Sequence, residues 1–268
     1  MKRYIAAIAV AVLLLGMLCI PETSSKEYTE ELPRLIIGSD NYEPYNYLDD
    51  DGNPVGIDVE LAEAVCGKLG FTPVFQRIAW DKKDEYLDKG QVDCLWGCFT
   101  MNGREKQYQW AGPYLYSRQV IAVRGNSGIT KISDLEGKRI AVQATTKPEE
   151  ILRKRSSPRI PETEMVYSMS GMDEIYASLR KGYVDAIAGH ESAIERFVQS
   201  APDVYEILDE SLYTSELGVA FKKGTHQELA QKMTQILTQM QEDGTLCDIA
   251  EKYGMDAEKA LGVTNAKP

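Results

Sequence analysis

The strongest constraint on the fold is an eight-residue pattern that occurs twice. Residues 87–94 and 179–186 both read Leu-x-Lys-Gly-x-Val-Asp followed by a small residue. In both copies another glycine follows the aspartate by four positions, at Gly97 and Gly189. Each copy is typical of a helix end, a glycine that stops the helix, and a buried strand. Two such units 92 residues apart predict two lobes of related construction rather than one continuous sheet.

The rest of the chain alternates short β-rich runs with amphipathic helical patterns, which indicates an α/β fold. Residues 49–54 read Asp-Asp-Asp-Gly-Asn-Pro and predict the tip of a hairpin. Thr146 is expected to cap a helix, with Glu149 completing a capping box. Strands are expected at 35–38, 72–76, 92–96, 119–123 and 139–143, and helices at 58–69, 81–89, from 146, at 229–240 and up to 253–254.

Composition narrows the class of protein. A chain of 268 residues is long enough for one large domain or two smaller ones. Its net charge of −11 argues against nucleic acid and against an anionic membrane surface as partners. With two histidines and five scattered cysteines, the sequence predicts no zinc site, and we expect neither a metal nor a cofactor.

The first 25 residues have the layout of a secretory signal. Lys2 and Arg3 precede an apolar run over residues 5–20, and a polar segment of small residues follows. A membrane-spanning helix usually needs about 20 apolar residues, so this run is short for an anchor. We therefore predict export after cleavage of residues 1–25, with lipid attachment at Cys19 as an alternative.

Four cysteines remain after such a cleavage: Cys66, Cys94, Cys98 and Cys247. In an exported protein they could form two disulfides, in any of three pairings. Buried free thiols are the other interpretation. The sequence leaves both open.

An ordered set of short motifs resembles one known family, the family 3 extracellular solute-binding proteins, which are the polar amino acid receptors of ABC importers. The resemblance spans about residues 33–255. The motifs are Asp40-x-Tyr42-x-Pro44-Tyr45, Gly56-Ile57-Asp58-Val59-Glu60-Leu61-Ala62, Gly90-x-Val92-Asp93, Arg104, Pro113-Tyr114, Asp134-Leu135-x-Gly137-Lys138, Val142-Gln143-Ala144-Thr145-Thr146, Gly182-x-Val184-Asp185-Ala186, Gly218-Val219-Ala220-Phe221-Lys222-Lys223-Gly224 and Asp243-Gly244-Thr245-Leu246.

The resemblance implies a two-lobed clamp of type II that closes on its ligand by a hinge motion. Two hinge strands would cross between the lobes near 115–118 and 212–218. Lobe 1 would then comprise 33–117 and 217–268, and lobe 2 would comprise 118–216. The implied partners are an amino acid or analogue and a membrane permease, and we expect a monomer at the periplasm or the outer face of the membrane.

The resemblance also implies how an amino acid would be held. Arg104 would bind the α-carboxylate, because a planar guanidinium matches a carboxylate with two parallel hydrogen bonds. Gly97 and Phe99 would contribute backbone N–H groups. Thr146 would place the N-terminus of a helix against the same anion.

The remaining candidates would surround the rest of the ligand. Tyr42 and Trp80 match the positions where the family places two aromatic faces around the ligand side chain. Asp40 would either pair with a positive ligand side chain or cap the turn after the first strand. His190 departs from the pattern, since many members carry an aspartate there for the α-ammonium and a neutral histidine supplies no charge. The ligand is therefore expected to be held differently, or to lack a free α-ammonium.

Receptor for uptake is the function that the sequence favours, with no enzymatic activity. A sensor module acting through a separate signalling partner is the first alternative. The second is a cyclohexadienyl-type dehydratase on the same fold, for which Glu43, Glu191 and His190 are the only candidate acid–base groups.

Overall fold

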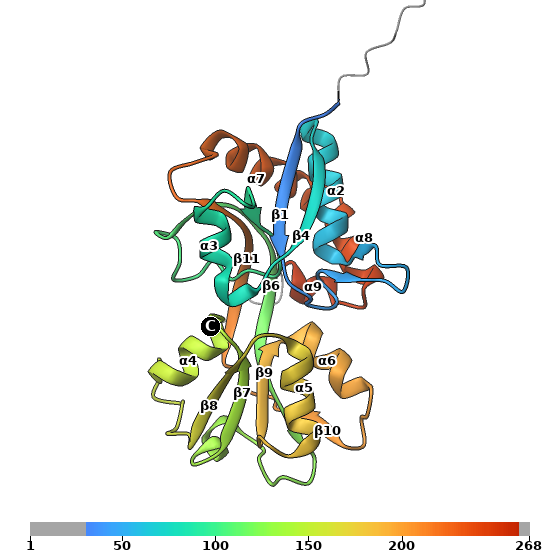
Figure 1. The fold of residues 1–268 in the computed structure, drawn as a ribbon. Helices are drawn as coiled ribbons and strands as arrows, with labels where there is room; N and C mark the ends of the chain where they lie inside the picture. The colour runs from blue at the N-terminus through green and yellow to red at the C-terminus, as the bar shows by residue number, and fades with distance from the viewer. Residues whose placement is uncertain (1–30, 263–268) are drawn as a thin grey trace, which may run out of the picture. The chain divides into compact units, whose positions relative to one another are not determined.

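The computed structural model describes residues 31–262. The predicted signal at 1–25 and Cys19 lie outside the described residues. Within the described part, two lobes are joined by long strands (Figure 1). No helix in this part is long and apolar enough to cross a membrane.

The two lobes share one arrangement of three parallel strands. In one lobe, β1 (Arg34–Ser39) lies between β4 (Thr72–Arg77) and β5 (Cys94–Leu95). In the other, β7 (Arg139–Gln143) lies between β8 (Met165–Met169) and β9 (Ala186–His190). The repeated pattern supplies the third strand of each set, β5 and β9. The prediction of two related lobes is confirmed at this level.

The aspartate of the repeat joins the third strand to the first. Asp93 accepts a hydrogen bond from the backbone N–H of Ile36 at 2.7 Å, and Asp185 accepts one from the backbone N–H of Arg139 at 2.9 Å. Each carboxylate thus satisfies a backbone donor at the start of the neighbouring strand. This shared contact explains why both copies of the pattern end in Val-Asp.

The expectation of separate sheets is wrong. The 17-residue strand β6 (Tyr108–Arg124) and the antiparallel β11 (Tyr213–Lys222) run through both lobes and give one continuous order, β4-β1-β5-β11-β6-β9-β7-β8, with β10 (Tyr205–Ile207) paired to β6. The pairing shifts at a bulge between Leu217 and Val219. Figure 1 shows these two strands linking the lobes, while the lobe boundaries at 117/118 and 216/217 stay a prediction.

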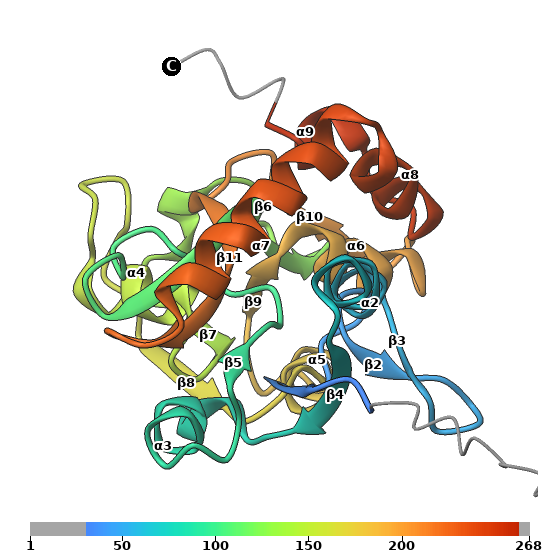
Figure 2. The same cartoon turned by 90° about the horizontal axis from the view of Figure 1, so that it is seen from above.

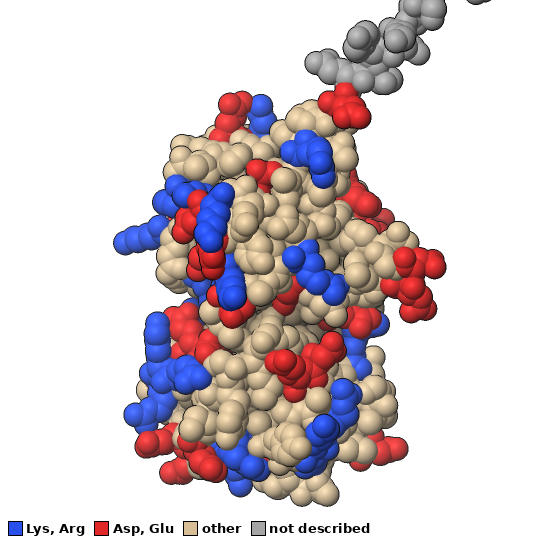
Figure 3. Space-filling model, in the orientation of Figure 1, with Lys and Arg blue, Asp and Glu red and all other residues tan. Residues whose placement is uncertain are grey.

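Helices cover the strands of each lobe. The first lobe carries α2 (Ile57–Leu69), α3 (Lys83–Asp88), α7 (Gln227–Glu242), α8 (Thr245–Lys252) and α9 (Ala257–Ala260), and the second carries α4 (Lys147–Lys154), α5 (Met172–Lys181) and α6 (Glu191–Gln199). Figure 2 shows α7 lying along β6 and β11. On the face drawn in Figure 3, acidic and basic side chains are interspersed over both lobes.

Most predicted elements are present, with changes at their ends. The hairpin tip joins β2 (Tyr47–Leu48) to β3 (Pro54–Val55). The helix expected at 81–89 begins as the 3-10 turn η1 (Trp80–Lys82), and a second 3-10 turn, η2 (Ile132–Leu135), precedes β7. The strand expected at 92–96 shortens to β5 because this segment turns into the site directly after Leu95. α6, α9, β8 and β10 were not predicted.

All four described cysteines are free thiols. Cys66, Cys94 and Cys98 are buried and Cys247 is half-buried. The structure therefore agrees with the free-thiol interpretation of the sequence.

Gly56 is required by a close backbone approach at the start of α2. Its φ is +130°, and a Cβ there would lie 2.3 Å from the carbonyl oxygen of Tyr45. The neighbouring amides of Ile57 and Asp58 donate to the carbonyls of Pro44 and Tyr45, so this contact fixes how the hairpin meets the helix.

Replacing Gly56 by alanine should lower the free energy of unfolding by about 2 kcal/mol or more, because both the φ and the contact are unfavourable for a side chain. Gly67→Ala is the matched control. Gly67 lies on the same helix with open space at its Cβ, and alanine there should add about 0.5–1 kcal/mol. Urea unfolding followed by circular dichroism measures both, and equal effects would contradict the prediction.

Candidate functional site

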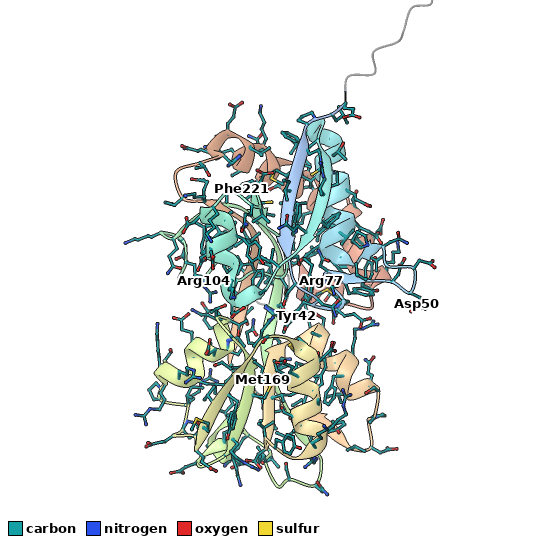
Figure 4. All side chains as sticks on the ribbon, in the orientation of Figure 1. Tyr42, Asp50, Arg77, Arg104, Met169 and Phe221 are labelled. Carbon is teal, nitrogen blue, oxygen red and sulfur yellow. The ribbon has the colours of Figure 1, made fainter. Side chains whose placement is uncertain are left out.

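All eight residues predicted for the site line one pocket between the lobes. Its space, including the solvent at its open mouth, is about 420 Å³. The predicted lining residues are Asp40, Tyr42, Trp80, Gly97, Phe99, Arg104, Thr146 and His190. Figure 4 places Tyr42 and Arg104 at the level where the lobes meet.

The pocket forms where strands of both lobes end. Asp40 directly follows β1, Gly97 follows β5 by two residues, Gln143 ends β7, and His190 ends β9. Parallel strands bring their carboxyl ends to the same edge of a sheet. The two related lobes therefore present equivalent strand ends to the pocket from opposite sides.

Arg104 is a buried cation with free hydrogen-bonding capacity. It is 9% exposed, its Nη1 donates to the carbonyl of Thr100 at 3.1 Å, and its Nη2 lies 4.0 Å from Glu150. Burial lowers the pKa of Arg104, but a guanidinium stays charged in proteins. Most of its five N–H donors therefore have no acceptor among the described residues and are available to an anion.

The N-terminus of α4 faces the pocket, but not through the predicted capping box. The Thr146 hydroxyl donates to the carbonyl of Gln143 at 2.6 Å instead of capping the helix. Glu149 accepts from the backbone N–H of Thr145 at 2.6 Å. The capping-box prediction is wrong, because Glu149 accepts its hydrogen bond from Thr145 and not from Thr146. The first-turn N–H groups consequently lack a side-chain cap and favour an anion.

Gly97 and Phe99 have steric roles that the sequence did not show. A Cβ at Gly97 would lie 2.6 Å from the Ser39 hydroxyl. The Phe99 ring packs edge-on against Trp80 at 5.1 Å and lies 5.3 Å from the guanidinium carbon of Arg104. Phe99 thus forms an aromatic wall beside the cation.

Tyr42 links the lobes across the pocket. Its hydroxyl accepts from the backbone N–H of His190 at 3.2 Å, and its ring meets the His190 ring edge-on at 5.9 Å. Tyr42 and Trp80 are both buried, so their lining faces are apolar.

Asp40 is the one carboxylate among the described residues that line this pocket. It accepts a hydrogen bond from Gln143 Nε2 in the other lobe. Burial raises the pKa of Asp40 to about 6, although Gln143 and the nearby cations Arg77 and Lys83 oppose the rise. The Asp40 carboxylate therefore bonds across the pocket to Gln143 and does not cap the turn after β1.

His190 is buried and uncharged. Burial, with the positive charge of Arg104, lowers the pKa of His190 to about 3. Its Nε2 lies 2.9 Å from Nε2 of Gln119, so the amide donates to an unprotonated ring nitrogen. The ring therefore offers no negative charge to a ligand and no positive one.

Several lining residues were missed by the sequence reasoning. Gln143 and Thr145 belong to a quoted motif in which only Thr146 was given a role, and Lys147 follows it. Gly189 is the counterpart of Gly97 in the repeated pattern but was not assigned to the site. The other lining residues that were not assigned to it are Cys98, Thr100, Gln119, Pro148 and Ala188.

Two of the three acid–base candidates of the dehydratase alternative, Glu43 and Glu191, are paired outside the pocket. Glu43 pairs with Arg196, and Glu191 pairs with Arg118 at 2.7 Å. Neither is among the residues that line the pocket.

A two-lobed α/β clamp with a pocket between its lobes is the architecture of extracytoplasmic solute-binding proteins. The sequence profile of the bacterial extracellular solute-binding proteins, family 3, matches residues 35–256, and the chain belongs to this family. The family indicates an exported protein that binds small amino acid ligands and acts with an ABC permease.

Relatives and solved structures agree with this assignment. The L-cystine-binding protein TcyJ of Escherichia coli is 30% identical over 235 residues, which cover 86% of each chain. An ancestral arginine-binding protein bound to arginine has a TM-score of 0.75 at 28% identity and covers 84% of this chain and 100% of its own. An ancestral amino acid-binding protein described as a precursor of cyclohexadienyl dehydratase has a TM-score of 0.74 at 26% identity, covering 83% and 96%.

We expect Asp40 to lower the stability of the ligand-free protein at neutral pH. Its folded pKa of about 6 exceeds the ordinary value of 3.8, so the folded state holds the proton more tightly than the unfolded chain. Ionised Asp40 then costs about 3 kcal/mol once the pH is well above 6, and this cost is largely lost as the pH falls to 4. Asp40→Asn should be more stable than the unmodified protein at pH 7, by an amount that shrinks towards zero at pH 4.

Denaturant unfolding at both pH values checks this. His190 is common to both proteins, so its titration cancels in the difference. Asp50→Asn, at the exposed hairpin tip, makes the same charge change and should have an effect below about 0.5 kcal/mol. A difference between Asp40→Asn and the unmodified protein that does not change with pH would contradict the prediction.

Proposed function

We propose that this protein is the substrate-binding component of an ABC importer and holds an amino acid or an amino-acid-like solute between its lobes. The proposal extends to a monomeric protein, with residues 1–25 as its secretion signal and lipid attachment at Cys19 as the alternative to soluble release.

The observation that carries the proposal is the arrangement of Arg104 and α4. A guanidinium with unused donors lies in the same pocket as a helix N-terminus that has no side-chain cap. A carboxylate placed between them would accept charge-assisted hydrogen bonds from both lobes. Such a ligand would favour the closed arrangement of the lobes, because it bonds to both of them only when they are together.

The positive group of the ligand would be received by Asp40. His190 is neutral and buried, so it cannot replace an aspartate as partner of an ammonium. Asp40 has only an uncharged hydrogen-bond donor, Gln143, within bonding distance. An ammonium beside Asp40 would compensate a buried charge, and would lower the pKa of Asp40 on binding.

The observed positions of Glu43 and Glu191 favour binding over dehydration. A general acid or base must reach the proton that it transfers, and both carboxylates are paired outside the pocket. His190 lines the pocket but is held uncharged by burial, and Asp40, the carboxylate of the pocket, is assigned here to the amino group of the ligand. We therefore propose a receptor without enzymatic activity.

Arg104→Gln should weaken ligand binding by about 100-fold, because it removes the charge-assisted hydrogen bonds to the carboxylate. The ligand is first found by thermal shift against the common L-amino acids and L-cystine, since a ligand at 100 times its Kd adds about 2.7 kcal/mol of stability. Calorimetric titration then measures the affinity. Arg155→Gln is the control, as Arg155 is exposed and pairs with Glu162.

An unchanged affinity in Arg104→Gln, with the variant folded by circular dichroism, would contradict the proposed site. The absence of any ligand in the panel would contradict the proposed function.

Asp40→Asn should weaken binding of the amino acid by about 10-fold or more. It should have little effect on the matching carboxylic acid without the amino group, because that acid has no ammonium to lose. Titration of both ligands into both proteins measures the coupling between Asp40 and the amino group. Unchanged affinity in Asp40→Asn, together with tighter binding in His190→Asp, would instead place the ammonium at position 190.

A further inference from the structure

Lys83 is a buried cation that the proposed function has not used. It is 3% exposed, at the first position of α3, directly after η1. Among the described residues, no carboxylate lies within 4.0 Å of its ammonium, since the ion pairs of this part of the chain do not include it. A buried charge without a paired counter-charge is costly and needs an explanation.

The Lys83 ammonium lies against residues that line the pocket. Its Nζ donates to the Thr145 hydroxyl of the other lobe at 2.7 Å and to the carbonyl of Trp80 at 3.5 Å. It also lies 5.2 Å from the Trp80 ring centre and 5.5 Å from that of Phe99. An ammonium has three N–H donors, and two acceptors are found for it in the described chain. Lys83 is not itself among the lining residues, so a ligand would reach its ammonium by replacing the hydroxyl of Thr145, which does line the pocket.

Lys83 therefore takes the cation position on Trp80. A cation is attracted to the face of an indole ring, and the family resemblance implies that the ligand side chain packs against Trp80. With the ammonium of Lys83 already there, a second cation would meet its repulsion at close range. The aromatic wall consequently disfavours ligands with a positive side chain.

Arg104 and Lys83 flank the same ring and repel each other. The Arg104 guanidinium carbon is 5.3 Å from the Phe99 centre, on which Lys83 also lies. Burial lowers the pKa of Lys83 to about 8, and Arg104 contributes to the fall, while Asp84 and Asp40 oppose it. Lys83 is still mainly charged at pH 7.

The buried charges of the site do not balance without a ligand. Three cations, Arg104, Lys83 and Lys147, face two carboxylates, Asp40 and Glu150, and Glu150 lies 3.3 Å from Lys147 and 4.0 Å from Arg104. A zwitterion with one carboxylate and one ammonium would preserve this excess of one positive charge. A ligand with a second carboxylate would remove it.

We propose that Lys83 is a second anion-binding group of the cleft and selects amino acids with an acidic side chain over those with a basic one. This inference rests on the proposed function. In this arrangement, Arg104 and the N-terminus of α4 bind one carboxylate of the ligand, and Asp40 binds its amino group. The Lys83 ammonium donates to the second carboxylate in place of the Thr145 hydroxyl.

Calorimetric titration at pH 7 tests the proposal with L-aspartate and L-glutamate, their amides L-asparagine and L-glutamine, and L-lysine. The unmodified protein should bind at least one of the two acids about 10-fold more tightly than its amide, and L-lysine more weakly still. In Lys83→Met, affinity for that acid should fall by about 10-fold or more while affinity for the amide stays within about 3-fold. The affinity for L-lysine should rise.

Lys82→Met is the matched control, because Lys82 is the exposed neighbour on the same turn, and it should behave as the unmodified protein. Lys83→Gln, which keeps hydrogen bonding but not charge, should also lose the preference. Tighter binding of L-lysine or an amide than of either acid would overturn the role of Lys83 and leave the proposed function standing. If Lys83→Met and Lys83→Gln both fold and still bind the acid more tightly than its amide, the role of Lys83 would also be overturned, with the proposed function unaffected. Failure of all amino acids to bind would overturn the proposed function itself.

Discussion

The rest of the structure depends on keeping a guanidinium away from water between two lobes. Moving a charge out of water is expensive unless other groups compensate it. Arg104 is partly compensated by the carbonyl of Thr100 and by Glu150. The remaining donors make the pocket a site that an anion would complete. The closed lobes exclude solvent, and this strengthens every electrostatic interaction in the pocket.

The architecture brings polar groups to this one place by duplicating a simple unit. In each lobe, parallel strands end at the pocket. The aspartate before the third strand accepts a hydrogen bond from a backbone N–H of the first strand. The shared strands β6 and β11 hold the two sets of strand ends facing each other. Two hydrogen bonds then join the lobes across the pocket, one from Gln143 to Asp40 and one from Lys83 to Thr145.

The sequence predicted the site residues better than their roles. All eight candidates line the pocket. Several of them lie at or directly after the ends of strands, and the fold brings these strand ends together. The Thr146 hydroxyl, however, donates to the carbonyl of Gln143 instead of capping α4. Glu149, the expected partner in the capping box, accepts from the backbone N–H of Thr145. Lys83 was passed over altogether: a lysine on a short helix gives no pattern that separates a buried cation from a solvated one.

The sequence by itself determined the repeated helix–strand unit and the strand ends that carry polar residues, and its resemblance to a known family singled out Arg104 as the candidate for binding a carboxylate. These follow from local periodicity, from glycines that stop helices, and from residue chemistry. Only the tertiary structure decided which charges are buried together. Desolvation depends on what packs around a group from distant segments, so the neutral state of His190, the raised pKa of Asp40 and the unpaired ammonium of Lys83 could not be read from neighbouring residues.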